Sequence, residues 1–178
     1  MRQPTLFSTP MWTFNAPVPD GVKEWALGYK KANASVVISN RGGYQSSLLE
    51  PDDMPFLLKQ CIDYYVHVID NTVNMVHWWI NVNGKGHSNG SHDHYDRTPP
   101  AEPMGVSGVF YIYVPEDNMG DIVFQGTVMR SNPTLYNPPK RFKPRKNRLL
   151  VFPSDCFHSV EPNESNKSRI SIAFNHIK

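Results

Sequence analysis

Residues 76–83 read VHWWINVN, and at this stretch the chain changes from helical spacing to a period of two. Further runs of β-branched and aromatic residues follow, each bounded by Gly, Pro, Asn or Asp, and this pattern is typical of short strands. The runs span residues 106–114, 121–124, 148–152 and 169–174. The second half of the chain therefore predicts an antiparallel barrel or jelly roll.

The first part of the chain contains two stretches with helical spacing. Residues 20–29 open with Asp20 as a candidate N-cap and place apolar side chains at i, i+3, i+4 and i+7. Residues 53–69 keep the same spacing and predict a second helix that packs against a sheet. Helices followed by strands indicate an α+β fold with two supporting helices in its N-terminal part.

The length and composition indicate one folded domain. The chain has 178 residues, of which 39% are hydrophobic and 12% aromatic, enough to build a core. We expect a single domain over residues 1–178, with helical support over 1–74 and a β core over 75–178. Cys61 and Cys156 are too few for a disulfide framework or a cysteine zinc site. No apolar run approaches the length of a bilayer helix and no signal peptide is visible, so we expect a cytoplasmic protein without a membrane partner.

The charge balance does not indicate a nucleic-acid partner. The chain carries 18 Lys and Arg against 16 Asp and Glu, a formal net charge of +2. Six cations gather in residues 140–148, which also contain Pro144. Two interpretations of this segment stay open, an exposed loop before a strand and a surface that steers an acidic substrate. A homodimer also stays open.

A histidine-rich segment carries the candidate chemistry. If residues 86–96 are extended, the alternate residues His92, His94 and Asp96 project to one face. Two histidines and one carboxylate form the ligand set of non-heme iron(II) oxygenases and leave coordination positions open. The further ligand has to come from elsewhere, and His158, which follows a buried-looking strand and a turn, is our candidate.

A second pair of residues predicts an anion site on the last strand. Arg169 can hold a carboxylate through two parallel hydrogen bonds. Ser171, two residues further along the strand, lies on the same face and adds a hydroxyl donor.

The order His-x-Asp, distal His and Arg-x-Ser resembles the 2-oxoglutarate- and Fe(II)-dependent oxygenases. More narrowly, the chain is similar to the small oxygenases of this type from marine bacteria and cyanophages. The matching pieces cover nearly the whole chain and lie at residues 8–12, 39–46, 79–81, 107–111, 150–154, 158, 161–163 and 169–175.

The resemblance implies a fold, three cofactors and a reaction. The fold would be a double-stranded β-helix, the cupin-like form of the jelly roll. Fe(II), 2-oxoglutarate and O2 would hydroxylate a substrate with release of succinate and CO2. Arg169 and Ser171 would hold the far carboxylate of 2-oxoglutarate, and Asn81 would be a further polar contact to it. If the protein is viral, its location would be the host cytoplasm.

The resemblance leaves two ligand pairs open. Members of the narrower group often show His-x-His, so His92 and His94 are the alternative to His94 and Asp96. We prefer His94, Asp96 and His158, because Asp96 supplies the carboxylate of the wider superfamily. Aromatic residues could line the pocket or belong to the core, namely Trp78, Trp79, Phe110, Tyr111 and Phe124.

Other functions compete with the oxygenase. A cupin-like metal protein would share the barrel and the histidines without needing Arg169 and Ser171. Cys156 and His158 could form a nucleophile pair, although no third orienting group is visible. In a non-enzymatic β-sandwich, a binding or structural protein, the histidines would be incidental. The sequence does not identify the substrate, which could be a small molecule, a protein side chain or a nucleobase.

Overall fold

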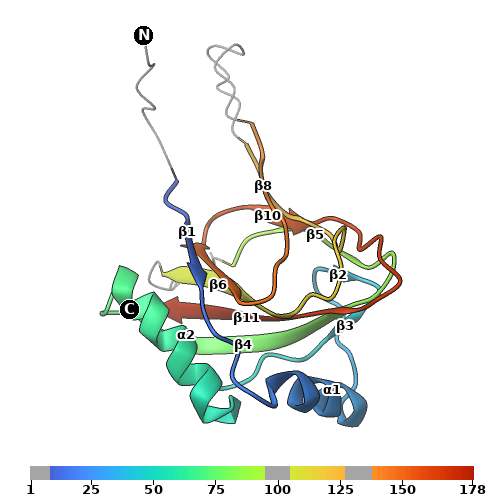
Figure 1. Cartoon of the computed structure of the whole chain (residues 1–178). Coiled ribbons are helices and arrows are strands. Elements are labelled where there is room, and N and C mark those ends of the chain that lie inside the picture. Colours follow the sequence, from blue (N-terminus) through green and yellow to red (C-terminus); the bar gives the residue numbers. More distant parts are fainter. Residues whose placement is uncertain (1–8, 95–104, 127–137) are drawn as a thin grey trace.

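A computed structural model describes residues 9–94, 105–126 and 138–178. Their strands form two antiparallel sheets, and two helices lie against one of them (Figure 1). The six-stranded sheet has the order β1 (Trp12–Asn15), β9 (Arg148–Pro153), β6 (Val106–Tyr113), β11 (Arg169–Ile177), β4 (Asn74–Asn83) and β3 (Tyr44–Gln45). The five-stranded sheet has the order β2 (Asn40–Arg41), β5 (Ser88–His92), β10 (His158–Val160), β7 (Ile122–Phe124) and β8 (Lys140–Phe142).

The helices cover the outer face of the six-stranded sheet. The first, α1, spans Val22–Ala32, and the second, α2, spans Phe56–Ile69 after a 3-10 turn (η1) at Pro51–Asp53. The buried residues of α2 recur every four positions, as the periodicity predicts, and join the same apolar cluster as the sheet. The predicted Asp20 cap is wrong, because the N-cap is Gly21 at φ 79° and no side chain caps the helix.

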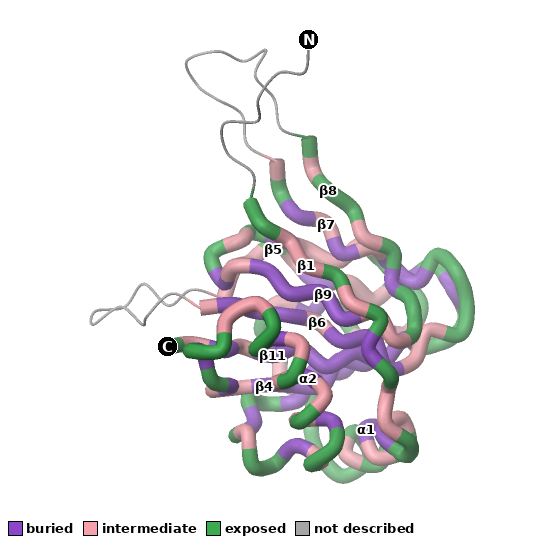
Figure 2. The backbone as a smooth tube through the Cα atoms, turned by 60° about the vertical axis from the view of Figure 1, so that its left-hand side comes forward, coloured by how far each residue is buried: buried purple, intermediate pink, exposed green. Residues whose placement is uncertain are grey.

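Strand alternation gives the six-stranded sheet two chemically different faces. On β4, Trp78, Ile80 and Val82 pack in the cluster that contains the helices. The intervening Trp79 and Asn81 line a pocket between the two sheets instead. Burying one large apolar side chain contributes about 1.5–3 kcal/mol, so the outer face stabilises the sheet and leaves the inner face available for polar residues. Figure 2 shows the buried backbone running along β4, β6, β9 and β11.

One part of the space between the sheets is filled by a second, smaller apolar cluster. Tyr111 and Phe152 from the six-stranded sheet pack there with Ile122 and Phe124 of β7. This contact holds the two sheets together at the side of the pocket. The polar residues described below occupy the remaining space.

The N-terminal part contributes strands as well as the two predicted helices. β1 and β3 form the two edges of the six-stranded sheet, and β2 forms an edge of the five-stranded one. The basic segment 140–148 is only partly a loop, because its first three residues form β8 against β7. Arg141 of β8 also pairs with Glu161, with 3.1 Å between Nε and Oε1. Within the described part of the chain, neither helix is long and apolar enough to span a bilayer.

Candidate active site

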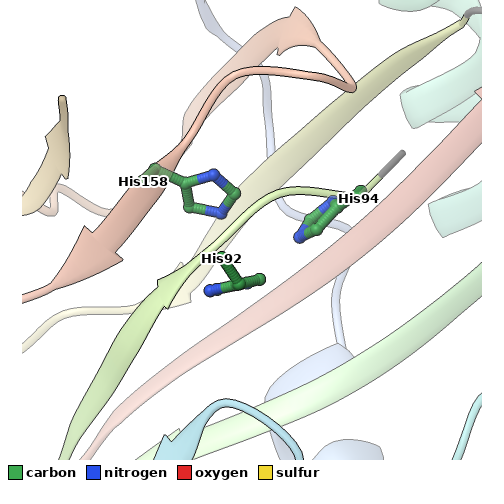
Figure 3. A group of neighbouring side chains, drawn as sticks. All are labelled: His92, His94 and His158. Atoms are coloured by element: carbon green, nitrogen blue, oxygen red, sulfur yellow. The ribbon is translucent and has the colours of Figure 1, made fainter. Parts of the chain in front are cut away.

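Three histidines, two on neighbouring strands and one just after the first of them, meet on the inner side of the five-stranded sheet. His92 ends β5, His94 follows two residues later, and His158 begins β10. Because β5 and β10 are antiparallel partners, His158 lies directly opposite His92. One ring nitrogen of each histidine lies within 4.8 Å of a ring nitrogen of the other two (Figure 3). The structure therefore brings together three ligand atoms suited to a divalent metal.

Each imidazole is oriented through its Nδ1 atom. His92 Nδ1 lies 2.8 Å from the carbonyl oxygen of Gly90, and His158 Nδ1 lies 2.9 Å from that of Cys156. His94 Nδ1 lies 3.0 Å from the side-chain oxygen of Asn175. An oxygen of this kind only accepts, so Nδ1 donates its proton in all three rings. The lone pair is then on Nε2, the arrangement found in metal-binding histidines with an outer hydrogen-bond partner.

The electrostatic surroundings keep two of the rings neutral. Burial, together with the nearby His158 and His92, lowers the pKa of His94 to about 3. Burial and the nearby His92 lower the pKa of His158 to about 4. Near neutral pH a metal therefore has no proton to displace from either ring.

An unsatisfied atom supports the fit to a metal. The Nε2 atom of His94 is buried and has no hydrogen-bond partner. A buried polar atom without a partner costs about 1–3 kcal/mol, which a bond to a cation would remove. Three imidazole nitrogens also form a donor set suited to iron, copper, nickel or zinc. The cluster of His92, His94 and His158 therefore fits a divalent metal such as iron.

The predicted ligand Asp96 lies outside the described residues. The structure thus brings together His94 and His158 from the preferred ligand set and His92 from the alternative one. His92 is a full member of the cluster, which the sequence left open.

The predicted anion site contains a buried arginine. Arg169 is only 3% exposed, and its Nη1 atom donates to the carbonyl oxygens of Met119 at 3.0 Å and Gly120 at 2.6 Å. Its Nε atom is buried without a partner. Burial lowers the pKa of Arg169 more than the nearby Tyr111 and Asp121 raise it, and no described carboxylate lies within ion-pair distance of the guanidinium. A buried guanidinium without an acidic partner is expensive, and a bound carboxylate would compensate it.

Ser171 and Asn81 extend this site across the sheet. Ser171 pairs with Asn81 on β4 and with Tyr111 on β6, so the three side chains form one row on the inner face. The Oδ1 atom of Asn81 is buried without a partner. Arg169, Ser171 and Asn81 line the same pocket as the three histidines.

Strand register separates the aromatic residues into pocket and core. Trp79 and Tyr111 line the pocket, and the Trp79 ring lies edge-on to His94 with 5.2 Å between centroids. The rings of Phe124 and His158 lie 5.6 Å apart between their centroids. Trp78 and Phe110 pack in the cluster that contains the helices, so a pocket role for these two is wrong.

Sequence reasoning missed further residues of the pocket. Phe152 lies 5.0 Å from His158 between ring centroids, and Ser39 and Asn89 line the pocket. The amide of Asn89 donates to the Ser39 hydroxyl at 3.1 Å. Ser39 and Asn89 have no sequence signal of their own, because only the pairing of β2 with β5 brings them beside the pocket.

The proposed Cys156–His158 nucleophile pair is not supported. Burial, with a contribution from Asp155, raises the pKa of Cys156 to about 11, so the thiol stays protonated near neutral pH. The Nδ1 atom of His158 contacts the backbone oxygen of Cys156. His158 is therefore oriented by this residue's backbone and turned toward the other two histidines.

Comparison with a family model identifies the region that contains the site. Residues 77–175 match the model of the family described as "Putative 2OG-Fe(II) oxygenase". The match includes the three histidines, Arg169 and Ser171. No protein with a curated description matches the chain by sequence.

Solved structures of low sequence identity share the fold. A prolyl-4-hydroxylase of Pseudomonas putida matches with a TM-score of 0.61 at 16% identity, over 96% of this chain and 94% of its own. The viral collagen prolyl hydroxylase from Paramecium Bursaria Chlorella virus-1, solved as a 2OG complex, matches with a TM-score of 0.62 at 14% identity, over 94% of this chain and 96% of its own. HygX from Streptomyces hygroscopicus, with nickel and 2-oxoglutarate bound, matches with a TM-score of 0.63 at 9% identity, over 95% of this chain and 83% of its own.

Proposed function

The chain belongs to the 2OG-Fe(II) oxygenase family, and from this premise we propose that His92, His94 and His158 hold its iron through their Nε2 atoms. These three residues would hold Fe(II), which would supply the chemistry for O2 to react as 2-oxoglutarate is decarboxylated to succinate and CO2. The observation that carries the proposal is the shared pocket, in which a three-histidine cluster lies together with a buried Arg169 that has no described carboxylate within ion-pair distance. The cupin-like and non-enzymatic alternatives do not require that combination.

The proposed ligand set uses His92 in place of Asp96. His92 is supported by its position opposite His158 and by the hydrogen bond that turns its Nε2 toward the cluster. Three imidazole ligands would bring no negative charge, so the charge of the ion would be compensated by the bound co-substrate. The set with Asp96 would bring one negative charge from the protein itself. The two sets therefore predict different losses of metal affinity in the His92→Ala and Asp96→Ala variants.

Arg169 and Ser171 would bind the far carboxylate of 2-oxoglutarate, with Asn81 as a further polar contact. Each hydrogen bond to a charged group contributes on the order of 1.5–3 kcal/mol, and burial strengthens such bonds by excluding water. Because the two backbone carbonyls already hold Nη1 of Arg169, the guanidinium is positioned before the co-substrate arrives. The side chains thus orient the co-substrate toward the histidine cluster.

We also propose that the two facing sheets form a double-stranded β-helix and that residues 1–178 make a single domain. The facing antiparallel sheets and the fold shared with 2OG oxygenases support this architecture. Strands β1 and β3 pair into one sheet and β2 into the other, which joins the N-terminal part to the core over residues 75–178.

The reaction we propose is hydroxylation of a C–H bond in a small molecule or a protein side chain. Of the proteins that share the fold, one is described as a collagen prolyl hydroxylase, and HygX was solved with the small molecule hygromycin B bound. The aromatic side chains of Trp79 and Tyr111 at the pocket wall would shield the reacting group from water.

The test is succinate formation by purified protein supplied with Fe(II), 2-oxoglutarate and O2. We expect succinate to accumulate faster than in a protein-free control even without substrate, and to require all three additions. The His158→Ala variant should lose this activity. Succinate formation at the wild-type rate in that variant, or at the rate of the protein-free control in the wild type, would overturn the proposed function.

A further inference from the structure

Asn175 contacts the Nδ1 atom of His94 and is not itself one of the three clustered histidines. It is on β11, and the alternation of that strand puts it on the same face as Arg169, Ser171 and Ala173. Its side-chain oxygen accepts the hydrogen bond from His94 Nδ1 at 3.0 Å. Asn175 therefore contacts the ring of a proposed metal ligand from outside the metal cluster.

Two serines support the amide of Asn175. The Ser107 hydroxyl donates to the same Oδ1 atom at 2.8 Å and lies 3.0 Å from the hydroxyl of Ser154. Ser107 is completely buried and is the strand partner of Asn175, so this contact is built into the β6–β11 pairing. The backbone oxygen of Ser154 accepts from the His94 N–H at 2.9 Å. His94 is thus held by both its ring and its backbone.

We infer that Asn175 is a positioning residue that selects the metal-binding tautomer of His94 and fixes the orientation of its ring. With Oδ1 toward His94, Nδ1 carries the proton and the lone pair is on Nε2, which faces the other histidines. The inference rests on the proposed function, because it requires His94 to be a ligand.

The orientation of the Asn175 amide decides which nitrogen of His94 carries the proton. If the amide nitrogen of Asn175 faced His94, Nδ1 would accept and the proton would lie on Nε2, where it blocks metal binding. With Oδ1 toward His94, the Ser107 hydroxyl can give its single proton to that oxygen and accept from the Ser154 hydroxyl, so this orientation satisfies the amide and both serines and leaves Nε2 free. Groups that orient a metal ligand in this way typically change metal affinity by about 10- to 100-fold when removed.

The experiment compares Asn175→Leu, which removes the acceptor at similar volume, with Asn175→Asp, which keeps an acceptor for both His94 and Ser107. The first measurement is calorimetric titration of Mn(II) into metal-free protein, with His94→Ala marking the loss of the ligand itself. The second is the long-range ¹H–¹⁵N correlation spectrum of the metal-free protein, which reports which nitrogen of His94 carries the proton.

We expect Asn175→Leu to weaken Mn(II) binding by about 10- to 100-fold and to move the His94 proton partly to Nε2, and Asn175→Asp to restore both. Wild-type affinity and tautomer in folded Asn175→Leu would overturn the inference. If Asn175→Leu does not fold, Ser107→Ala replaces it, and we expect a severalfold weaker affinity and a mixed tautomer, the absence of which would also overturn the inference. Wild-type protein that does not bind Mn(II), or His94→Ala that binds it as tightly as wild type, would instead contradict the proposed function.

Discussion

His158 lies directly opposite His92 across the β5–β10 pair, so two of the proposed ligands are placed by strand register and not by a loop. The backbone oxygens of Gly90 and Cys156, each two residues before its histidine, hold the Nδ1 atoms of the two rings. A metal bound by both side chains would add a bond between neighbouring strands. The site and the stability of the five-stranded sheet should therefore be coupled.

Metal binding should raise the thermal stability of the protein. A ligand that binds only the folded state adds about 2.7 kcal/mol at a hundredfold excess over its dissociation constant. We expect Mn(II) to raise Tm in the wild type and in His67→Ala, whose histidine lies on α2 outside the cluster. His158→Ala should show no such rise. Thermal unfolding with and without Mn(II) checks this, and an equal rise in His158→Ala would contradict the ligand role.

The His92 and Asp96 variants separate the two ligand sets. If His92, His94 and His158 bind the metal, His92→Ala should weaken Mn(II) binding strongly, whereas Asp96→Ala should keep near wild-type affinity. Anaerobic calorimetric titration measures both. The reverse pattern would assign the site to His94, Asp96 and His158, as the sequence interpretation preferred.

The co-substrate pocket should be selective for the geometry of Arg169. Lysine keeps the charge but not the planar fork, so Arg169→Lys should weaken 2-oxoglutarate binding to the Mn(II)-loaded protein by about tenfold or more. Ser171→Ala removes one neutral hydrogen bond worth about 1 kcal/mol and should cost about fivefold. Neither change should alter Mn(II) affinity. Equal 2-oxoglutarate affinity in wild type and Arg169→Lys would show that Arg169 does not bind the co-substrate carboxylate.

The metal-free protein should lose stability as the pH falls below about 6.5. Burial lowers the pKa of His176 even though its Nε2 atom lies 3.0 Å from Oδ1 of Asp63. Burial lowers the pKa values of His94 and His158 as well. Each buried ring binds its proton more weakly in the folded than in the unfolded chain, so protonation favours unfolding. The free energy of unfolding should fall by up to about 1.4 kcal/mol per pH unit for each histidine.

Urea unfolding between about pH 5 and pH 7.5 measures this slope, and His176→Gln provides the control. Glutamine keeps a donor toward Asp63 but does not titrate, so the slope should decrease by the contribution of one proton. A free energy of unfolding that is independent of pH in the wild type would mean that these histidines are not shielded from solvent.

The long strands could be predicted from the sequence because their side chains alternate. The runs at 76–83, 106–114 and 169–174 correspond to β4, β6 and β11, each within a few residues at its ends. In contrast, β5 reads SNGSH and has no β-branched or aromatic residue. It is a strand because its backbone pairs with β2 and β10, a tertiary contact that no local pattern reveals.

The candidate site was partly predictable for the same reason. Arg169 and Ser171 are two residues apart, and this spacing correctly placed them on one face. Extending the same period would have put Asn175 on that face too. The contact of Asn175 with His94 could not be predicted, because it depends on how the segment after β5 crosses toward the other sheet.

The most direct test of the proposed site is anaerobic calorimetric titration of 2-oxoglutarate into wild-type protein with and without Mn(II). A metal held by the three histidines beside Arg169 should bind the keto acid end while the arginine binds the far carboxylate. We therefore predict one 2-oxoglutarate per chain, bound at least tenfold more tightly when Mn(II) is present, since each 1.4 kcal/mol is a factor of ten. No binding to the Mn(II)-loaded protein, or equal binding with and without the metal, would contradict it.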